Sequence, residues 1–299
     1  MCTREVTPPT QRLRLAHAEA RSAYSLLAPV ILFFLIFHYY PILKSIGISF
    51  TEYGLLNRRT PFVGLENYIR QFQDPLFLAA LWNTVVFVAA AVIIGVVLAL
   101  ILAVLVESTG RWAKYYRTLY FIPVVTSLLA TSMIWRWLYS SEGLLNFIMT
   151  WFGFQPQAWL LGEDLALGSL IALTVWKNLG FDLILFAAAI QAVPGELYEA
   201  SSMDGASATQ DFFHITLPQL RPIVALVGIT AVIRSFQVFA IVLAMTQGGP
   251  VNATRTVVYH IYEQGIQYDD IGYASAAAVI LLLIVATVTL IQWRMTTGE

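Results

Sequence analysis

Six long apolar stretches run along this chain, and they constrain its fold more than any other feature of the sequence. A helix needs about 20 mostly apolar residues to cross the hydrocarbon core of a bilayer. The stretches cover about 22–43, 81–106, 118–138, 165–192, 222–244 and 271–293. We therefore expect an all-α integral membrane protein with six transmembrane helices, because helices satisfy their own backbone hydrogen bonds in lipid. A polar leader over residues 1–21 precedes the membrane domain, which covers 22–299.

The low content of charged residues also favours lipid as the surrounding medium. Only 12% of the residues are charged, against about 25% in soluble proteins, and the mean hydropathy is +0.71. A net charge of -1 offers no basic surface to nucleic acid. The one cysteine, Cys2, and four scattered histidines form neither a disulfide framework nor a metal-ligand spacing. We expect neither nucleic acid nor a bound metal.

The distribution of Lys and Arg predicts the orientation of the helices, because short cytoplasmic loops are enriched in these residues. The leader carries four of them, and the short loop between the second and third stretches carries Arg111, Lys114 and Arg117. The basic segment between the first two stretches is long, and the rule weakens there. Six spans with a cytoplasmic amino terminus place both termini, and the segment 194–218, in the cytoplasm.

The first apolar stretch could be a cleaved signal peptide or a retained helix. Its apolar run is longer than the signal-peptide core of about 7–15 residues. Tyr39-Tyr40-Pro41 follows the run, where a signal peptide has small residues. We interpret it as a retained transmembrane helix.

The segment 194–218 has the pattern of a short helix between two spans. Pro194 suits the first turn of a helix, and Glu196 and Glu199 complement the positive end of the helix dipole. Gly205 interrupts this helix at a cost of about 1 kcal/mol relative to alanine. The interruption indicates either a close approach by another backbone or a break in the helix.

Three partners are conceivable for this short helix: the bilayer surface, the helix bundle itself, or another protein. Helices that bind the bilayer surface carry Lys and Arg on their polar face. None occurs between Gln191 and His214. The sequence therefore favours a protein partner.

Three elements of this segment resemble a known motif. Glu199-Ala200-Ser201, Asp204-Gly205-Ala206 and Ile215-Thr-Leu-Pro218 are similar to the EAA loop of permease subunits in binding-protein-dependent ABC importers. Ser201 departs from the usual alanine, and it is also small. The resemblance implies the type I ABC importer permease fold, with a coupling helix that docks on a cytoplasmic ATPase. The implied contact residues are Glu199, Ala200, Ser201, Met203, Asp204, Gly205 and Ala206.

Other segments resemble the carbohydrate branch of these permeases, of the maltose and glycerol-phosphate type. They include Phe62-Val-Gly-Leu-Glu-Asn-Tyr68, Trp82-Asn83-Thr84 and Thr246-Gln-Gly-Gly-Pro250. The resemblance implies half of a translocation pathway for a sugar or oligosaccharide in a bacterial-type plasma (inner) membrane. The implied partners are a second homologous permease, two copies of an ATPase subunit and an extracytoplasmic solute-binding protein.

The chain itself contains no Gly-Lys dipeptide, and so it has no P-loop for nucleotide. We therefore expect a non-catalytic subunit without a cofactor of its own. ATP and Mg would then be bound by the partner ATPase.

Charged, polar and aromatic residues inside the fourth and fifth stretches are the candidates for the substrate path, because sugars stack on aromatic rings and bind polar side chains through their hydroxyls. A charge at the centre of a bilayer costs about 3 kcal/mol or more, so it faces the bundle interior or a water-filled path. The candidates are Trp176, Lys177, Asp182, Arg234 and Gln237. The alternative is structural: a buried Lys–Asp or Arg–Asp pair that fixes the packing of the helices.

Two other functional classes remain open at this point. One is a secondary transporter or an ion channel; secondary transporters often have two repeated halves, and we find no such repeat. A membrane-embedded enzyme would need a catalytic motif such as H-E-x-x-H or G-x-S-x-G, and none occurs. Among importers, glycerol phosphate or another polyol is the alternative substrate to a sugar.

Overall fold

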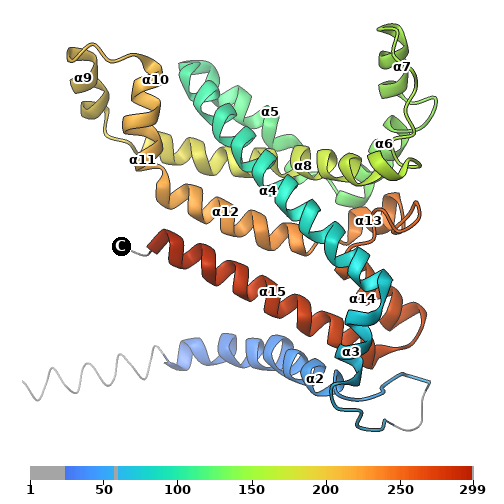
Figure 1. Cartoon of the computed structure of the whole chain (residues 1–299). Helices are drawn as coiled ribbons and strands as arrows, with labels where there is room; N and C mark the ends of the chain where they lie inside the picture. Colours follow the sequence, from blue (N-terminus) through green and yellow to red (C-terminus); the bar gives the residue numbers. More distant parts are fainter. Residues whose placement is uncertain (1–23, 57–59, 298–299) are drawn as a thin grey trace, which may run out of the picture.

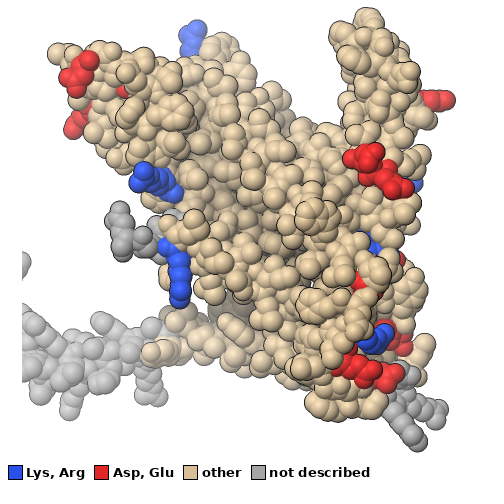
Figure 2. All heavy atoms as spheres, viewed as in Figure 1, with Lys and Arg blue, Asp and Glu red and all other residues tan. Residues whose placement is uncertain are grey.

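The computed structural model describes residues 24–56 and 60–297, so the expected leader 1–21 and Cys2 lie outside the described residues. The regular secondary structure of the described part is helical, apart from one isolated β-bridge between Thr51 and Phe62. Four of its helices are long and apolar enough to cross a membrane, and two bent helix pairs bring the number to six. Figure 1 shows the long helices running in roughly the same direction, and Figure 2 shows the charged side chains gathered toward the two ends, with few on the surface between them.

The first long helix covers Tyr24–Ile48 and contains η1 (Leu35–Tyr39) and α2 (Tyr40–Ile48). It continues beyond the expected end at 43, and Pro41, which has no N–H to donate to the preceding turn, lies in the first turn of α2, directly after the π-helical turn η1. In the most apolar part of this helix, no residue is buried by the rest of the described chain. It contacts the rest of the chain mainly where α2 approaches α15 (Ile271–Thr297).

Two long helices, α4 (Pro75–Ser108) and α8 (Glu163–Gln191), form the centre of the molecule. The side chain of Asp74 caps α4 by accepting a hydrogen bond from the backbone N–H of Leu76. This cap starts the helix six residues before the expected 81. Small residues spaced by four line the buried face of α4, and they let α8 pack closely against it. These residues are Ala91, Gly95, Ala99 and Ala103.

The third expected span is not one helix. η2 (Gly110–Trp112) leads into α5 (Ala113–Val125), which is followed by α6 (Leu128–Leu138), and the axis turns by 96° between them. Pro123 lies in the last turn of α5, and Thr126 and Ser127 have extended backbones. Since proline lacks an N–H and disfavours the helical conformation before it, the helix ends within a few residues.

The fifth expected span, 222–244, is also interrupted. α12 covers Arg221–Phe236, residues 237–239 leave the helix, and α13 resumes over Ala240–Met245. Before α12 lie α10 (Ala208–Asp211), η3 (Phe212–Thr216) and α11 (Leu217–Gln219), bent from it by 68°. The two interruptions, after α5 and after α12, occur in helices that both pack against α8.

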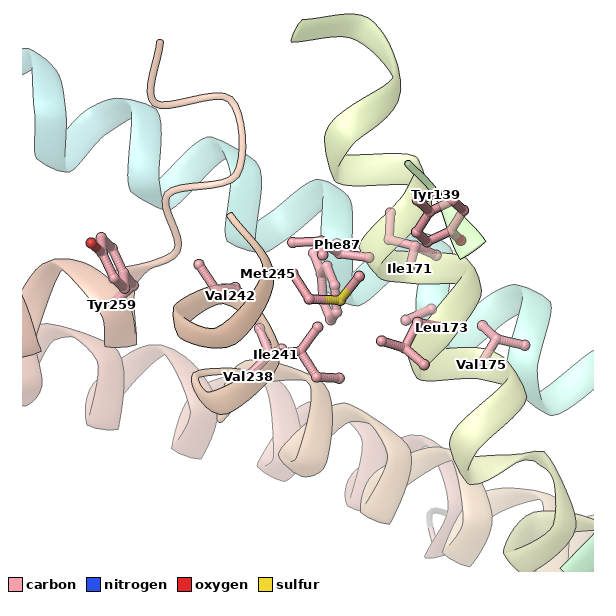
Figure 3. Close-up of a cluster of buried hydrophobic side chains, with 12 residues drawn as sticks. Phe87, Tyr139, Ile171, Leu173, Val175, Val238, Ile241, Val242, Met245 and Tyr259 are labelled. Carbon is pink, nitrogen blue, oxygen red and sulfur yellow. The ribbon is translucent and has the colours of Figure 1, made fainter. Parts of the chain in front are cut away.

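Short helices occupy the two ends of the bundle (Figure 1). At one end lie α3 (Glu66–Gln73), α7 (Leu144–Trp151), α14 (Val257–Tyr262) and η4 (Glu263–Gln267). At the other end lies α9 (Gly195–Met203), together with α10. The cores of the two halves of α8 differ. The amino-terminal half packs against α13, as Figure 3 shows for Leu173 and Ile241. The carboxyl-terminal half, which includes Leu183, packs against α4 and α12.

Candidate substrate path and coupling segment

A cleft of about 590 Å³ opens where the two helix interruptions meet α8. Polar groups on its wall come from the end of α5, from the middle of α8 and from the end of α12. They are Thr126, Thr174, Lys177, Asn178, Arg234 and Gln237. The cleft therefore gathers three of the candidates that the sequence identified, Lys177, Arg234 and Gln237. Thr126 was not among the candidates; its position three residues after Pro123 was the available signal.

Lys177 holds the end of α5. Its ammonium group donates to the backbone oxygens of Pro123, Val124 (3.2 Å) and Thr126 (2.7 Å), and to Thr126 Oγ1 (3.2 Å). Carbonyls in the last turn of a helix have no partner within the helix and carry the negative end of its dipole. An ammonium has three donors, so these four acceptors saturate it. The side chain is thereby a structural brace of the cleft wall.

Arg234 and Asp182 form an ion pair behind the cleft. Arg234 Nη2 lies 2.6 Å from Asp182 Oδ1, and the guanidinium carbon lies 5.1 Å from the centre of the Phe181 ring. The Asp182 side chain is only 4% exposed, whereas that of Arg234 is 32% exposed and reaches the cleft. The sequence allowed Asp182 to pair with either Lys177 or Arg234, and in the structure it pairs with Arg234.

Gln237 and Trp176 occupy different environments. Gln237 lies at the carboxyl end of α12 with an exposed side chain on the cleft wall. Trp176 is absent from the cleft wall and packs against Trp135, with 5.3 Å between the ring centres. The Gln237 amide is thus open to the cleft, and Trp176 belongs to the contact between α6 and α8.

The segment 194–218 presents a fully unburied helix. No residue of α9 is buried, and Met203 is 88% exposed. None of the four ion pairs in the described residues includes Glu199 or Asp204. The helix is fixed to η3 through Tyr198, whose hydroxyl lies 2.8 Å from Thr216 Oγ1. α9 therefore has a defined position and an open surface.

Gly205 ends this helix by its backbone conformation. Its φ is +74°, a region that residues with a side chain rarely adopt. A Cβ at this position would meet no atom of the chain within 4 Å. Of the two explanations that the sequence left open, the break accounts for the glycine within this chain.

Comparisons with known proteins agree with this architecture. Residues 95–295 match the family described as "binding-protein-dependent transport system inner membrane component". The chain therefore belongs to this family of membrane transport subunits. It is 33% identical to the arabinooligosaccharides transport system permease protein AraP of Bacillus subtilis (strain 168), over 94% of this chain and 90% of that protein.

Two further relatives match this chain over a similar share of its length. The probable ABC transporter permease protein YurN of Bacillus subtilis (strain 168) is 33% identical over 91% of this chain and 94% of its own length. The sn-glycerol-3-phosphate transport system permease protein UgpA of Escherichia coli O6:K15:H31 is 31% identical over 92% of this chain and 94% of its own.

The fold also has a solved counterpart. A chain in the crystal structure of a bacterial ABC transporter involved in the import of the acidic polysaccharide alginate superimposes with a TM-score of 0.83. The two chains share 24% sequence identity, and the match covers 96% of this chain and all of that one. The two chains thus share one fold.

Proposed function

We propose that this chain is one of two permease subunits of an ATP-driven importer and forms half of the pathway for a sugar or oligosaccharide. The observation that carries the proposal is the polar cleft at the two helix interruptions. It offers amide, hydroxyl and guanidinium groups beside an apolar wall, the combination that small-molecule sites use. The family assignment supplies the transport class, and AraP supplies the saccharide substrate by its name.

A second, homologous permease would complete the pathway. This chain alone does not enclose the cleft, and the most apolar window of the long helix Tyr24–Ile48 is not buried in the described structure. Six helices cannot easily enclose a sugar-sized path and also separate it from lipid. A partner of the same fold would close the cleft.

The open surface of α9 suits docking of a cytoplasmic ATPase, of which two copies would serve the two permeases. Glu199 and Asp204 have no ionic partner in the described part of the chain, so basic groups of the ATPase would pair with them. ATP and Mg would be bound there. With the ATPase docked on α9, the 194–218 segment and both termini would lie in the cytoplasm. The binding protein would act on the other side of the plasma (inner) membrane.

The relatives named for glycerol phosphate make that anion the second candidate substrate. The cations of the cleft argue against it. The donors of Lys177 are saturated by backbone oxygens, and Arg234 is paired with a carboxylate. Neither is a free counter-ion for a phosphate, because Asp182 offsets the charge of Arg234, whose remaining N–H groups can still donate to a sugar hydroxyl. This half of the pathway therefore favours a neutral sugar.

Uptake into proteoliposomes tests the proposal. The two permeases and the ATPase are reconstituted, and the binding protein is added with labelled arabino-oligosaccharides or labelled glycerol phosphate. We expect ATP-dependent uptake of the oligosaccharide and little uptake of glycerol phosphate. Uptake that persists without the ATPase subunit would contradict the importer mechanism, and preferential uptake of glycerol phosphate would contradict the substrate class alone.

A further inference from the structure

The hairpin of residues 143–162 projects sideways from the end of the bundle opposite α9. Figure 1 shows α7 lying across the direction of the long helices, and Figure 2 shows that the surface of this projection is almost free of charged side chains. The segment contains no Asp, Glu, Lys or Arg in 20 consecutive residues. We propose that this hairpin is a membrane anchor, with α7 lying in the interface between the lipid headgroups and the acyl chains.

The hairpin has a fixed shape that is built on one buried side chain. Asn146 Nδ2 donates to the backbone oxygens of Ser140 (3.2 Å) and Gln157 (3.0 Å). Its Oδ1 accepts from the backbone N–H of Gln157 (2.9 Å) and from the indole N–H of Trp159 (3.0 Å). Only 2% of Asn146 is exposed. Asn146 is thereby buried inside the hairpin, and the opposite side of α7 is held outward.

The outward side is apolar and aromatic. Leu144, Phe147, Ile148 and Trp151 follow the spacing of one helix face, and Phe152 and Phe154 continue it in the loop. Trp151 is 79% exposed and Phe152 is 75% exposed. A monomeric protein rarely leaves so continuous an apolar surface in water. The surface therefore has a non-aqueous neighbour.

The composition of this surface identifies lipid as that neighbour. Tryptophan and other aromatic rings concentrate at the level of the headgroups, where their apolar bodies and polar edges are both satisfied. Protein interfaces, by contrast, have a polar rim and are enriched in arginine. Charged groups occur only where the hairpin joins the bundle, at Glu142, Glu163 and Asp164, all of which are exposed.

The apolar surface also continues onto the membrane domain. α6 precedes the hairpin directly in the chain, and it exposes Met133, Ile134 and Trp137. Their exposed fractions are between 60% and 65%. α7 thus extends an apolar surface that the membrane domain already has, which is what an interfacial helix does.

The anchor would hold one wall of a second pocket, of about 680 Å³. Asn146, Gln157 and Trp159 form part of this wall, and Gln247 and Pro250 of the loop after α13 face them. Asn146 lines the pocket and also holds α7 to the rest of the hairpin. A change in the depth of α7 in the membrane would therefore move this wall of the pocket.

Spin labels on the assembled transporter test the proposal. In a Cys2→Ser background, Phe147→Cys, Trp151→Cys and Phe154→Cys are labelled with a nitroxide, and the complex is placed in phosphatidylcholine nanodiscs. Oxygen, which concentrates in lipid, and a water-soluble nickel chelate are used as collision partners. Glu142→Cys, at the junction with the bundle, is the water-facing control.

We expect the ratio of oxygen to nickel collisions to be several-fold higher at the three hairpin positions than at Glu142→Cys. Nickel collisions at the hairpin equal to those of the control would mean a water-facing surface and overturn the proposal. Low collision with both reagents would mean a protein cover, and it would overturn the proposal as well. Three labelled positions are used so that loss of one variant leaves the others, and bimane quenching by brominated lipid at the same positions gives a second measurement.

Discussion

Lys177 of α8 donates a hydrogen bond of 2.7 Å to the backbone oxygen of Thr126, at the point where α5 ends. Two residues separated by 51 positions thereby fix the break that shapes the cleft. Unpartnered carbonyls in an apolar bundle would otherwise be costly. The break and the lysine form one structural unit.

Replacement of Lys177 by methionine should destabilise the permease by about 1–3 kcal/mol, because partly buried carbonyl oxygens at the end of α5 lose their donor. The measurement is thermal unfolding of the detergent-solubilised transporter. Arg136→Met, at an exposed basic residue, is the control. An unchanged unfolding midpoint for Lys177→Met would show that the carbonyls have another donor.

The Arg234–Asp182 pair should matter more when half of it is removed than when both halves are removed. Asp182→Ala leaves a positive charge in an apolar bundle, which we expect to cost about 1–3 kcal/mol after allowance for the partial exposure of Arg234. The double variant Asp182→Ala, Arg234→Met should recover part of that loss. A double-mutant cycle on thermal stability measures the coupling, and additive effects would contradict the pairing.

At Gly180, α8 passes close to the backbone of α5. A Cβ at Gly180 would lie 2.0 Å from the backbone oxygen of Tyr120, so Gly180→Ala forces the helices apart. We expect a loss of at least about 1–3 kcal/mol, the range for overpacked cores. Gly168→Ala is a matched control on the same helix, because its Cβ would meet no atom within 4 Å. Equal stability of the two variants in thermal unfolding would contradict the close crossing.

Glu199→Arg and Gly205→Asp test the coupling role of the 194–218 segment. Both positions are exposed, and aspartate tolerates a positive φ better than most residues, so the permease should still fold and insert. We expect loss of ATPase binding in a membrane pull-down, with loss of sugar uptake. Gly195→Ala, at a glycine with open space around it, is the control. If both variants keep the ATPase and full uptake, the segment is a cap of the helix bundle.

His260 of α14 should give the permease a pH-dependent stability. Burial lowers the pKa of His260 to about 4; Arg255 acts in the same direction, whereas Asp74 and Glu263 oppose it. The ring also lies 6.0 Å from that of Tyr273. An unfolded histidine has a pKa of about 6.5, so below that pH the unfolded state binds the proton first.

The contribution of His260 is therefore complete above pH of about 6.5 and declines as the pH falls toward about 4. Between roughly pH 7 and pH 5, the midpoint of thermal unfolding should fall less in His260→Gln than in the parent protein. Most of this interval lies between the pKa of the unfolded histidine, about 6.5, and that of the folded one, about 4. Parallel pH profiles for the two proteins would show that His260 titrates normally.

The sequence determined the medium and the family of this protein. Hydropathy over a window of about 20 residues reports the cost of placing a segment in lipid, and this cost is local to the segment. The Glu199 to Pro218 motif is local as well, since its three elements lie within one short stretch of chain. Both features could be recognised without knowledge of any contact, and the family match confirms the class of protein that they indicated.

The tertiary structure decided the shape of the path and the partners of its charges. Apolar composition sets whether a segment enters the membrane, but it does not show whether the helix is continuous, and so the turns after Val125 and Phe236 were missed. The partners of Lys177 and Arg234 lie more than 50 residues away in the sequence. Lys177 could have paired with a carboxylate or with exposed carbonyls, and only the break in α5, which brings those carbonyls beside α8, determines the choice.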